Sequence, residues 1–338
     1  MNVRTEESGP RPWARWQRSG DRGVGVGKDP DRRSGTPGAP DIDTLVTLPF
    51  EVDAVLTLGP LRHGPYDPTI RFEGPVAWWA TRTLEGPATV RLAPGRAGWR
   101  ASAWGQGAAW MISQVPRLLG SEDEPGALVL CPGPLRDIAA SLAGLRFGRS
   151  DRVLASLVPA VIEQKVTGLE AQRSYRRLVL RYGEPAPGPG GLRLAPSAGT
   201  LAALAYFELH PLGLEQRRAV TLIRAAQDAD RLEAAVGLPA AEALARLRTV
   251  PGVGPWTAAE TARAAFGDPD AVSIGDFHLP HLVCWALAGE PRGDDARMLE
   301  LLDPYRGQRA RLVRLLELSG IRAPRYGPRT SGRAIERL

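Results

Sequence analysis

A glycine-rich turn and a single carboxylate lie close together in the second half of this 338-residue chain. The turn is the run Pro251-Gly252-Val253-Gly254, followed by Trp256 and Thr257, and the carboxylate belongs to Asp276, 20 residues beyond Trp256. Bare backbone N–H groups at the start of a helix bind anions such as phosphate, because the helix dipole favours negative charge there. One positioned acid can stabilise developing positive charge or orient a water molecule. The spacing therefore predicts a phosphate-binding turn beside a reactive carboxylate.

Two short amphipathic helices must hold such a turn. The apolar residues that predict them are Leu247 and Val250 before the turn and Ala258, Ala262 and Phe266 after it. Gly252 and Gly254 allow positive φ in a tight hairpin, and Val253 between them is expected to enter the core. An ordinary helix-turn-helix corner, with glycines for geometry alone, is the alternative.

The segment closely resembles the helix-hairpin-helix of the DNA glycosylase superfamily. In that superfamily a Gly/Pro-rich loop with an essential aspartate follows the hairpin, and here residues 267–270 lead into Ser273-Ile274-Gly275-Asp276-Phe277-His278. The resemblance implies that Asp276 is the catalytic carboxylate. It also implies that the hairpin binds DNA through Gly252, Val253, Gly254 and Thr257.

A second segment, residues 163–168, resembles the Gln-x-Val/Ile-Ser helix end of the alkylpurine glycosylases. The resemblance implies DNA contacts by Gln164 and Lys165. Lys165 occupies the position near the wedge that fills the gap left by a flipped base, although some relatives have an apolar residue there. A plain helix end followed by Gly168 is the alternative.

Trp256 stands at the hairpin position where bifunctional glycosylases have a lysine that forms a Schiff base with C1′ of the sugar. The resemblance therefore implies a monofunctional enzyme. A tryptophan face can also attract a cationic base. Tyr305 aligns with an aromatic element that lines the base pocket, so Trp256 and Tyr305 are the predicted pocket residues. Glu260 replaces a residue that is sometimes aromatic in relatives. Packing in the core is the alternative for both aromatic residues.

A basic helix is predicted after the Leu212-Gly213-Leu214 turn. Its residues Arg217 and Arg218 fit either the superfamily's loop and following helix or a solvated basic face. The formal net charge of the chain is +6, which favours a polyanionic partner, although an arginine-rich composition also arises in GC-rich genomes.

Metal and cofactor chemistry is not expected. The two cysteines, Cys131 and Cys284, are too few for a four-cysteine cluster. His278 and His281 could share a helix face, but no Glu or Cys completes a metal site beside them. No apolar run has the length of a membrane span and no signal-peptide core follows Met1, so a cytoplasmic protein is expected.

The chain is predicted to form an α+β fold in four parts. Residues 1–42, poor in large apolar residues, are expected to be a disordered tail. Residues 43–130 alternate apolar and polar residues between Gly/Pro turns, which predicts an antiparallel sheet with one or two helices. Residues 131–322 are expected to be all-α, with a loop over 185–189, and residues 323–338 to be a basic tail. The predicted helices span 152–166, 169–182, 200–209, 216–229, 240–247, 258–266, 279–288, 294–302 and 308–318.

These features predict a monofunctional, monomeric DNA glycosylase of base excision repair. Its substrates are expected to be alkylated purines such as 3-methyladenine in duplex DNA, released by base flipping and Asp276-assisted hydrolysis. An enzyme for oxidised or deaminated purines (8-oxoguanine, hypoxanthine) and a non-catalytic helix-hairpin-helix DNA-binding protein are the alternatives.

Overall fold

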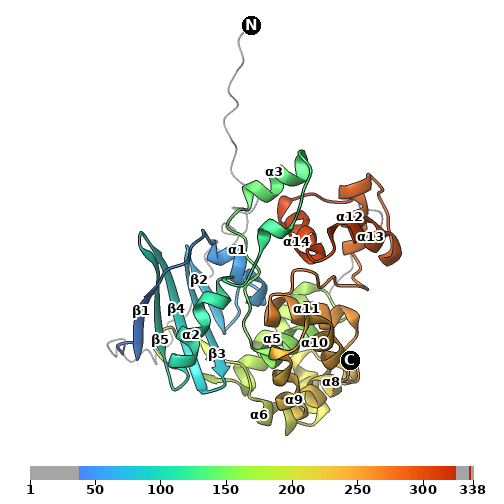
Figure 1. The fold of residues 1–338 in the computed structure, drawn as a ribbon. Helices are drawn as coiled ribbons and strands as arrows, with labels where there is room; N and C mark the ends of the chain where they lie inside the picture. The colour runs from blue at the N-terminus through green and yellow to red at the C-terminus, as the bar shows by residue number, and fades with distance from the viewer. Residues whose placement is uncertain (1–37, 325–334, 336–338) are drawn as a thin grey trace, which may run out of the picture.

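The computed structural model describes residues 38–324 and residue 335. Its first part is a five-stranded antiparallel sheet in the order β1-β5-β4-β3-β2, which confirms the predicted sheet (Figure 1). The strands are β1 (Ile42–Val46), β2 (Ile70–Glu73), β3 (Val76–Thr83), β4 (Gly86–Gly95) and β5 (Gly98–Trp104). Strands β2 to β5 form a meander, and β1 closes the sheet against β5.

Each face of the sheet is covered by different elements, because successive side chains of a strand point to opposite faces. Helices α1 (Ala54–Leu58) and α2 (Ala108–Leu118) pack on the face that carries Trp79. On the other face Trp78 stacks on Trp104, with 5.5 Å between ring centroids. Leu192 and Leu194 cover that pair, so a segment of the helical part returns to the sheet.

This returning segment contains a short strand pair, β6 (Glu184–Pro185) with β7 (Arg193–Leu194). Only Pro185 of this pair falls in the predicted loop over 185–189, and the other residues fall in the part predicted to be all-α. The predicted segment of helices therefore carries one small β element, and this element ties it to the sheet.

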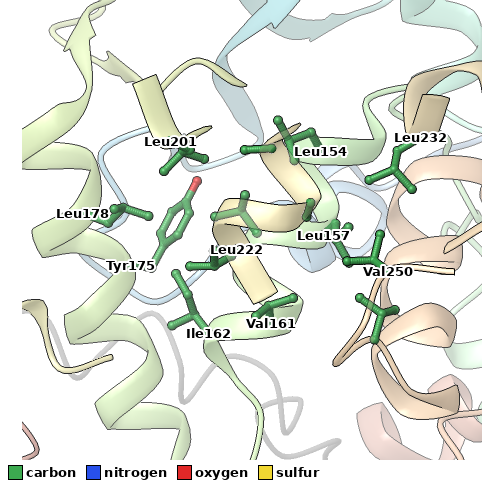
Figure 2. Packing of buried hydrophobic residues seen from close by; sticks show 14 of the residues in the cluster. Leu154, Leu157, Val161, Ile162, Tyr175, Leu178, Leu201, Leu222, Leu232 and Val250 are labelled. Carbon is green, nitrogen blue, oxygen red and sulfur yellow. The ribbon is translucent and has the colours of Figure 1, made fainter. Parts of the chain in front are cut away.

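The rest of the described chain is helical. The helices are α3 (Pro134–Ser141), α4 (Val153–Ile162), α5 (Gly168–Tyr182), α6 (Ala198–Ala202), α7 (Tyr206–Leu209), α8 (Gln216–Gln227), α9 (Ala229–Glu233), α10 (Ala240–Leu247), α11 (Pro255–Phe266), α12 (Leu279–Ala288), α13 (Asp295–Leu302) and α14 (Arg309–Ser319). Helix α4 is almost wholly apolar and buried, which is typical of a central core helix. Figure 2 shows its Leu157 and Val161 close to Leu222 of α8 and to Val250.

Helices α12 to α14 enclose a separate apolar cluster, to which α3 also contributes Leu135. Figure 1 shows these helices above the group that contains α8, α10 and α11, with the sheet to the left of that group. The polar loop from α11 to α12 connects the two helical groups.

The predicted tails fall largely on residues that are not described. The described chain begins at residue 38, and its first residues lie on the sheet: Trp104 Nε1 donates to the carbonyl of Gly38 (3.0 Å), and the N–H of Asp41 donates to Ala103 (2.9 Å). The basic tail predicted over 323–338 lies outside the described residues except at 323, 324 and 335. No helix of the described residues is long and apolar enough to span a membrane.

Candidate active site

The hairpin between α10 and α11 requires one of its two glycines. Gly252 has a φ of +100°, and a Cβ there would lie 2.1 Å from Thr221 Oγ1. Gly254 has an extended backbone with φ −92° and ψ −177°, and a Cβ there would have no atom within 4 Å. The expectation of positive φ at both glycines is therefore confirmed at Gly252 and wrong at Gly254.

Val253 and Thr257 face the core. Val253 is buried, as expected of a plug, and its N–H donates to the carbonyl of Val250 (3.0 Å). Thr257 is also buried, and its hydroxyl accepts a hydrogen bond from Gln164 Nε2 (2.7 Å). Since protein encloses both side chains, a contact of these two residues with DNA would have to come from their backbone.

Gln164 ties the end of α4 to the hairpin. Its Nε2 also donates to the carbonyl of Gly252 (3.0 Å), so one amide group holds both the turn and the first turn of α11. Lys165, the next residue, is exposed and has a φ of +55°. A positive φ in a non-glycine residue costs about 1 kcal/mol or more, so the neighbouring contacts must hold it. On one side of Lys165, the hydrogen bonds of Gln164 hold the chain in place. On the other side, the capping box that Thr167 forms at the start of α5 does so.

Asp276 is fixed through both carboxylate oxygens. Oδ1 accepts hydrogen bonds from the backbone N–H groups of His278 (2.7 Å) and Leu279 (2.8 Å), at the start of α12. Oδ2 accepts a hydrogen bond from Trp256 Nε1 at 3.1 Å. The structure thus brings together Trp256 and Asp276, the aromatic and acidic residues predicted for the site.

Carboxylates anchor the loop that carries Asp276. Asp270 accepts hydrogen bonds from the N–H groups of Gly307 (2.8 Å) and Arg309 (3.0 Å) and pairs with the Arg309 guanidinium (2.6 Å). Burial alone would raise the pKa of Asp270, but the bonds and charge of Arg309 hold this pKa below its ordinary value. Further along, Asp295 accepts from the N–H of Gly275 (3.0 Å). The loop is therefore held from both ends.

A cavity of about 340 Å³ lies between the sheet and helices α4, α11 and α14. Its size suits a small ring system. Trp256 lines it, whereas Asp276 does not and is connected to it through the Trp256 hydrogen bond. The basic and acidic side chains of the lining are Arg62, His63, Arg146, Glu163, Glu260, Arg263, Arg314 and Glu317.

Tyr305 lies elsewhere. It ends a short 3-10 turn, Asp303–Tyr305, and packs against the apolar cluster of α12 to α14. It does not line this cavity, and its packing agrees with the alternative of a core residue. The aromatic lining comes instead from Trp79, Phe147, Tyr175 and Trp256. Sequence reasoning missed the first three, since distant segments bring them together and no local motif marks them.

A second hollow, of about 360 Å³, lies against the hairpin beside Pro251 and Gly252. The exposed arginines Arg217 and Arg224 of α8 line it. Arg218 points the other way: its side chain is 1% exposed and donates to the carbonyls of Ile162 (2.6 Å) and Gly213 (3.2 Å). Of the two neighbouring arginines, only Arg217 reaches the surface of the hairpin.

Both cysteines are unpaired, Cys131 at the surface and Cys284 in the interior. In the part of the chain that the structure describes, no three His, Cys, Asp or Glu side chains are grouped so that they could hold a metal ion.

Comparison with curated proteins gives one partial match in sequence. The chain is 32% identical over 168 residues to the probable bifunctional transcriptional activator/DNA repair enzyme AlkA of Mycobacterium tuberculosis. The aligned part is 48% of this chain and 34% of that protein, so the chain matches about a third of its relative's length. No family model matches.

Solved structures match over most of the chain. A 3-methyladenine DNA glycosylase from Archaeoglobus fulgidus superposes with a TM-score of 0.68 at 19% identity, over 82% of this chain and 98% of that one. An 8-oxoguanine glycosylase/lyase from Clostridium acetobutylicum superposes with a TM-score of 0.65 at 11% identity, over 85% and 99%. The fold is that of the helix-hairpin-helix DNA glycosylases, and the predicted resemblance is confirmed at this level.

Proposed function

We propose that this chain, which has the fold of the helix-hairpin-helix DNA glycosylases, is a monofunctional glycosylase that removes alkylated purines from duplex DNA. One observation carries the proposal: Trp256, which lines a cavity of purine size, donates a hydrogen bond from Nε1 to Oδ2 of Asp276. A fixed carboxylate therefore lies directly behind the cavity wall. A non-catalytic DNA-binding protein would need neither the acid nor the cavity. The names of the M. tuberculosis and A. fulgidus relatives agree with this proposal.

DNA binding is assigned to the hairpin face. Backbone N–H groups near Gly252 and Gly254, at the start of α11, would hold a phosphate, and Arg217 and Arg224 would contact the neighbouring backbone. Lys165 projects from the loop between α4 and α5, where it would enter the gap left by the flipped base or contact a phosphate.

The chemical step is assigned to Asp276. As the bond between C1′ and the base nitrogen breaks, the base keeps the electron pair and the sugar gains oxocarbenium character. The carboxylate stabilises that charge and orients the water whose oxygen adds to C1′, and it accepts the proton that this water loses. A base alkylated at N3 or N7 is already positively charged and leaves as a neutral molecule, so no strong general acid is needed. Such an enzyme would act as a monomer on the bacterial nucleoid.

Lys165 is the only lysine in residues 38–324, and it lies on a different segment from Trp256. An amine nucleophile is therefore not placed at the hairpin, and the product is expected to be an intact strand with an abasic site.

The test is a panel of duplexes, each with one lesion: 7-methylguanine, 1,N6-ethenoadenine, hypoxanthine or 8-oxoguanine. Strand cleavage is measured with and without alkali. We expect cleavage only after alkali, and on the alkylated bases first. Duplex binding without any abasic product would support the non-catalytic alternative. A borohydride-trapped adduct that disappears in Lys165→Ala would overturn the monofunctional mechanism.

A further inference from the structure

Glu260 lies on the cavity wall one helical turn beyond Trp256. Its Oε1 accepts a hydrogen bond from Ser273 Oγ (2.5 Å) and also pairs with Arg263. Oε1 makes both of these contacts. The Glu260 side chain is 24% exposed, so a bound molecule can reach it.

Glu163 contributes a second carboxylate to the same cavity, from the end of α4. Its ion-pair contact is His63 Nδ1 at 3.6 Å, which is longer than a hydrogen bond. The side chain is 35% exposed. Both acceptor oxygens of Glu163 are therefore available to a ligand.

The arginines of the cavity already have partners. Arg263 pairs with Glu260. Burial alone would lower the pKa of Arg263, but the nearby carboxylates of Glu260, Glu317 and Asp276 hold it above its ordinary value. Arg314 pairs with Glu317 at 3.1 Å. The other two arginines donate to backbone carbonyls: Arg62 to Pro65 (2.8 Å), and Arg146 to Glu51 (3.2 Å).

We propose that Glu260 and Glu163 determine specificity by selecting a purine that carries positive charge and offers N–H donors. This inference rests on the proposed function. Carboxylates attract a cation strongly in a site shielded from water, and they accept N–H groups. A neutral base without such donors would displace water from both carboxylates and give them no hydrogen bond in return, which costs binding free energy. 7-Methylguanine fits, because it is cationic in DNA and carries adjacent donors at N1 and the 2-amino group.

The experiment compares 7-methylguanine with 1,N6-ethenoadenine, which is neutral and lacks those donors, in the same duplex sequence. Single-turnover excision is measured for the wild type, Glu163→Gln and Glu260→Gln. We expect each variant to lose about tenfold on 7-methylguanine and to keep or gain activity on ethenoadenine, because only the first base needs the charge and the second no longer has to desolvate it. Glu300→Gln is the control, since Glu300 is an exposed residue of α13 outside the cavity.

Glu260→Gln also removes the partner of Arg263, so the melting temperature of each variant is recorded. Glu163→Gln removes only the longer contact with His63, at 3.6 Å, and it decides the question if Glu260→Gln is unstable. Equal losses on both bases, or no loss on either, would overturn the selection role. A wild type that excises ethenoadenine but not 7-methylguanine would overturn it too, and would leave the glycosylase proposal standing. Excision of neither base, with duplex binding intact, would overturn both.

Discussion

The hairpin and the acid loop (residues 267–276) are held in different ways. The hairpin is fixed from inside, by buried Val253 and Thr257 and by the Gln164 amide that donates to its backbone. The acid loop buries Ala271 and Val272 in its middle, and carboxylates hold it on either side, Asp270 before them and Asp295 after them. Packing therefore determines the hairpin, whereas the loop needs carboxylate contacts in addition to packing. Substitutions in the first should change stability and binding, and substitutions in the second should change the rate of base release.

The two regions meet at the hydrogen bond between Trp256 and Asp276. Trp256 belongs to the rigid helix α11, whereas Asp276 ends a loop that exposed Ile274 and Phe277 flank. The hydrogen bond from Trp256 on this helix therefore fixes the position of the Asp276 carboxylate, which lies on a loop at the surface. The following predictions test this division, beginning with the largest effect.

Asp276→Asn should reduce base release by about a thousandfold or more, because the negative charge that stabilises the oxocarbenium ion is lost while the shape is kept. Asn Oδ1 can still accept the N–H groups of His278 and Leu279, so the loop should hold its form. Duplex affinity should stay within about twofold, since no phosphate contact is assigned to this residue. The measurement pairs single-turnover excision with a binding titration.

The control is Asp295→Asn, which weakens the anchor of Gly275 but leaves the reactive carboxylate in place. It should cost far less than Asp276→Asn. Retention of most of the activity by Asp276→Asn would show that another group stabilises the transition state.

Trp256→Phe should lower excision by about tenfold to a hundredfold, because a hydrogen bond to a charged group contributes about 1.5–3 kcal/mol. The ring still fills the cavity wall, so duplex binding should change little. Trp285→Phe, on α12 and outside the cavity, is the control and should be nearly silent. If Trp256→Phe and Trp285→Phe behave alike, the hydrogen bond does not position the acid.

Gly252→Ala should destabilise the protein by about 2 kcal/mol, because the added Cβ meets Thr221 and the φ is positive. It should also weaken binding to every duplex, damaged or not. Gly254→Ala should leave the melting temperature unchanged, since its backbone is extended and its Cβ site is open. Thermal unfolding separates the two variants. Equal destabilisation would mean that the hairpin is not fixed from inside at Gly252.

Local patterns predicted much of this fold. Alternation over short segments gave the antiparallel sheet, and helical spacing gave α11 over nearly its whole length, Pro255–Phe266. The helix predicted over 152–166 ends earlier, at Ile162, because Lys165 adopts a left-handed backbone. The helix predicted over 200–209 is two helices, since the Glu208 side chain accepts from the N–H of Ala205 and begins a new one. Such side-chain caps leave little trace in apolar periodicity.

The candidate site was predictable where a motif is contiguous. Trp256 and Asp276 meet as expected because a short stretch of chain joins them. The cavity was not predictable in the same way: Trp79 comes from β3 and Phe147 from the segment before α4, and only tertiary packing brings them together. The sequence left Tyr305 between pocket and core, because an aromatic residue near a loop has the same local pattern in both places.

Arg217→Gln should have the smallest effect, a loss of DNA affinity of a few fold. The slope of log affinity against log salt should fall by about 0.9, the value of one phosphate contact. Melting temperature should not change, because the side chain is exposed. Arg96→Gln, in the turn between β4 and β5 away from the hairpin, is the matched control and should leave the slope unchanged.

Arg218→Gln sharpens the same contrast one residue further along α8. Its guanidinium is buried and bonds two carbonyls, so removing it should lower stability by about 3 kcal/mol while the salt slope of the remaining folded protein stays at the wild-type value. This result would assign different roles to the two neighbours: Arg217 would contact DNA, and Arg218 would stabilise the end of α4 through its hydrogen bond to Ile162. A reduced slope in Arg218→Gln, with an unchanged slope in Arg217→Gln, would reverse these roles and move the DNA away from the Arg217 face of the hairpin.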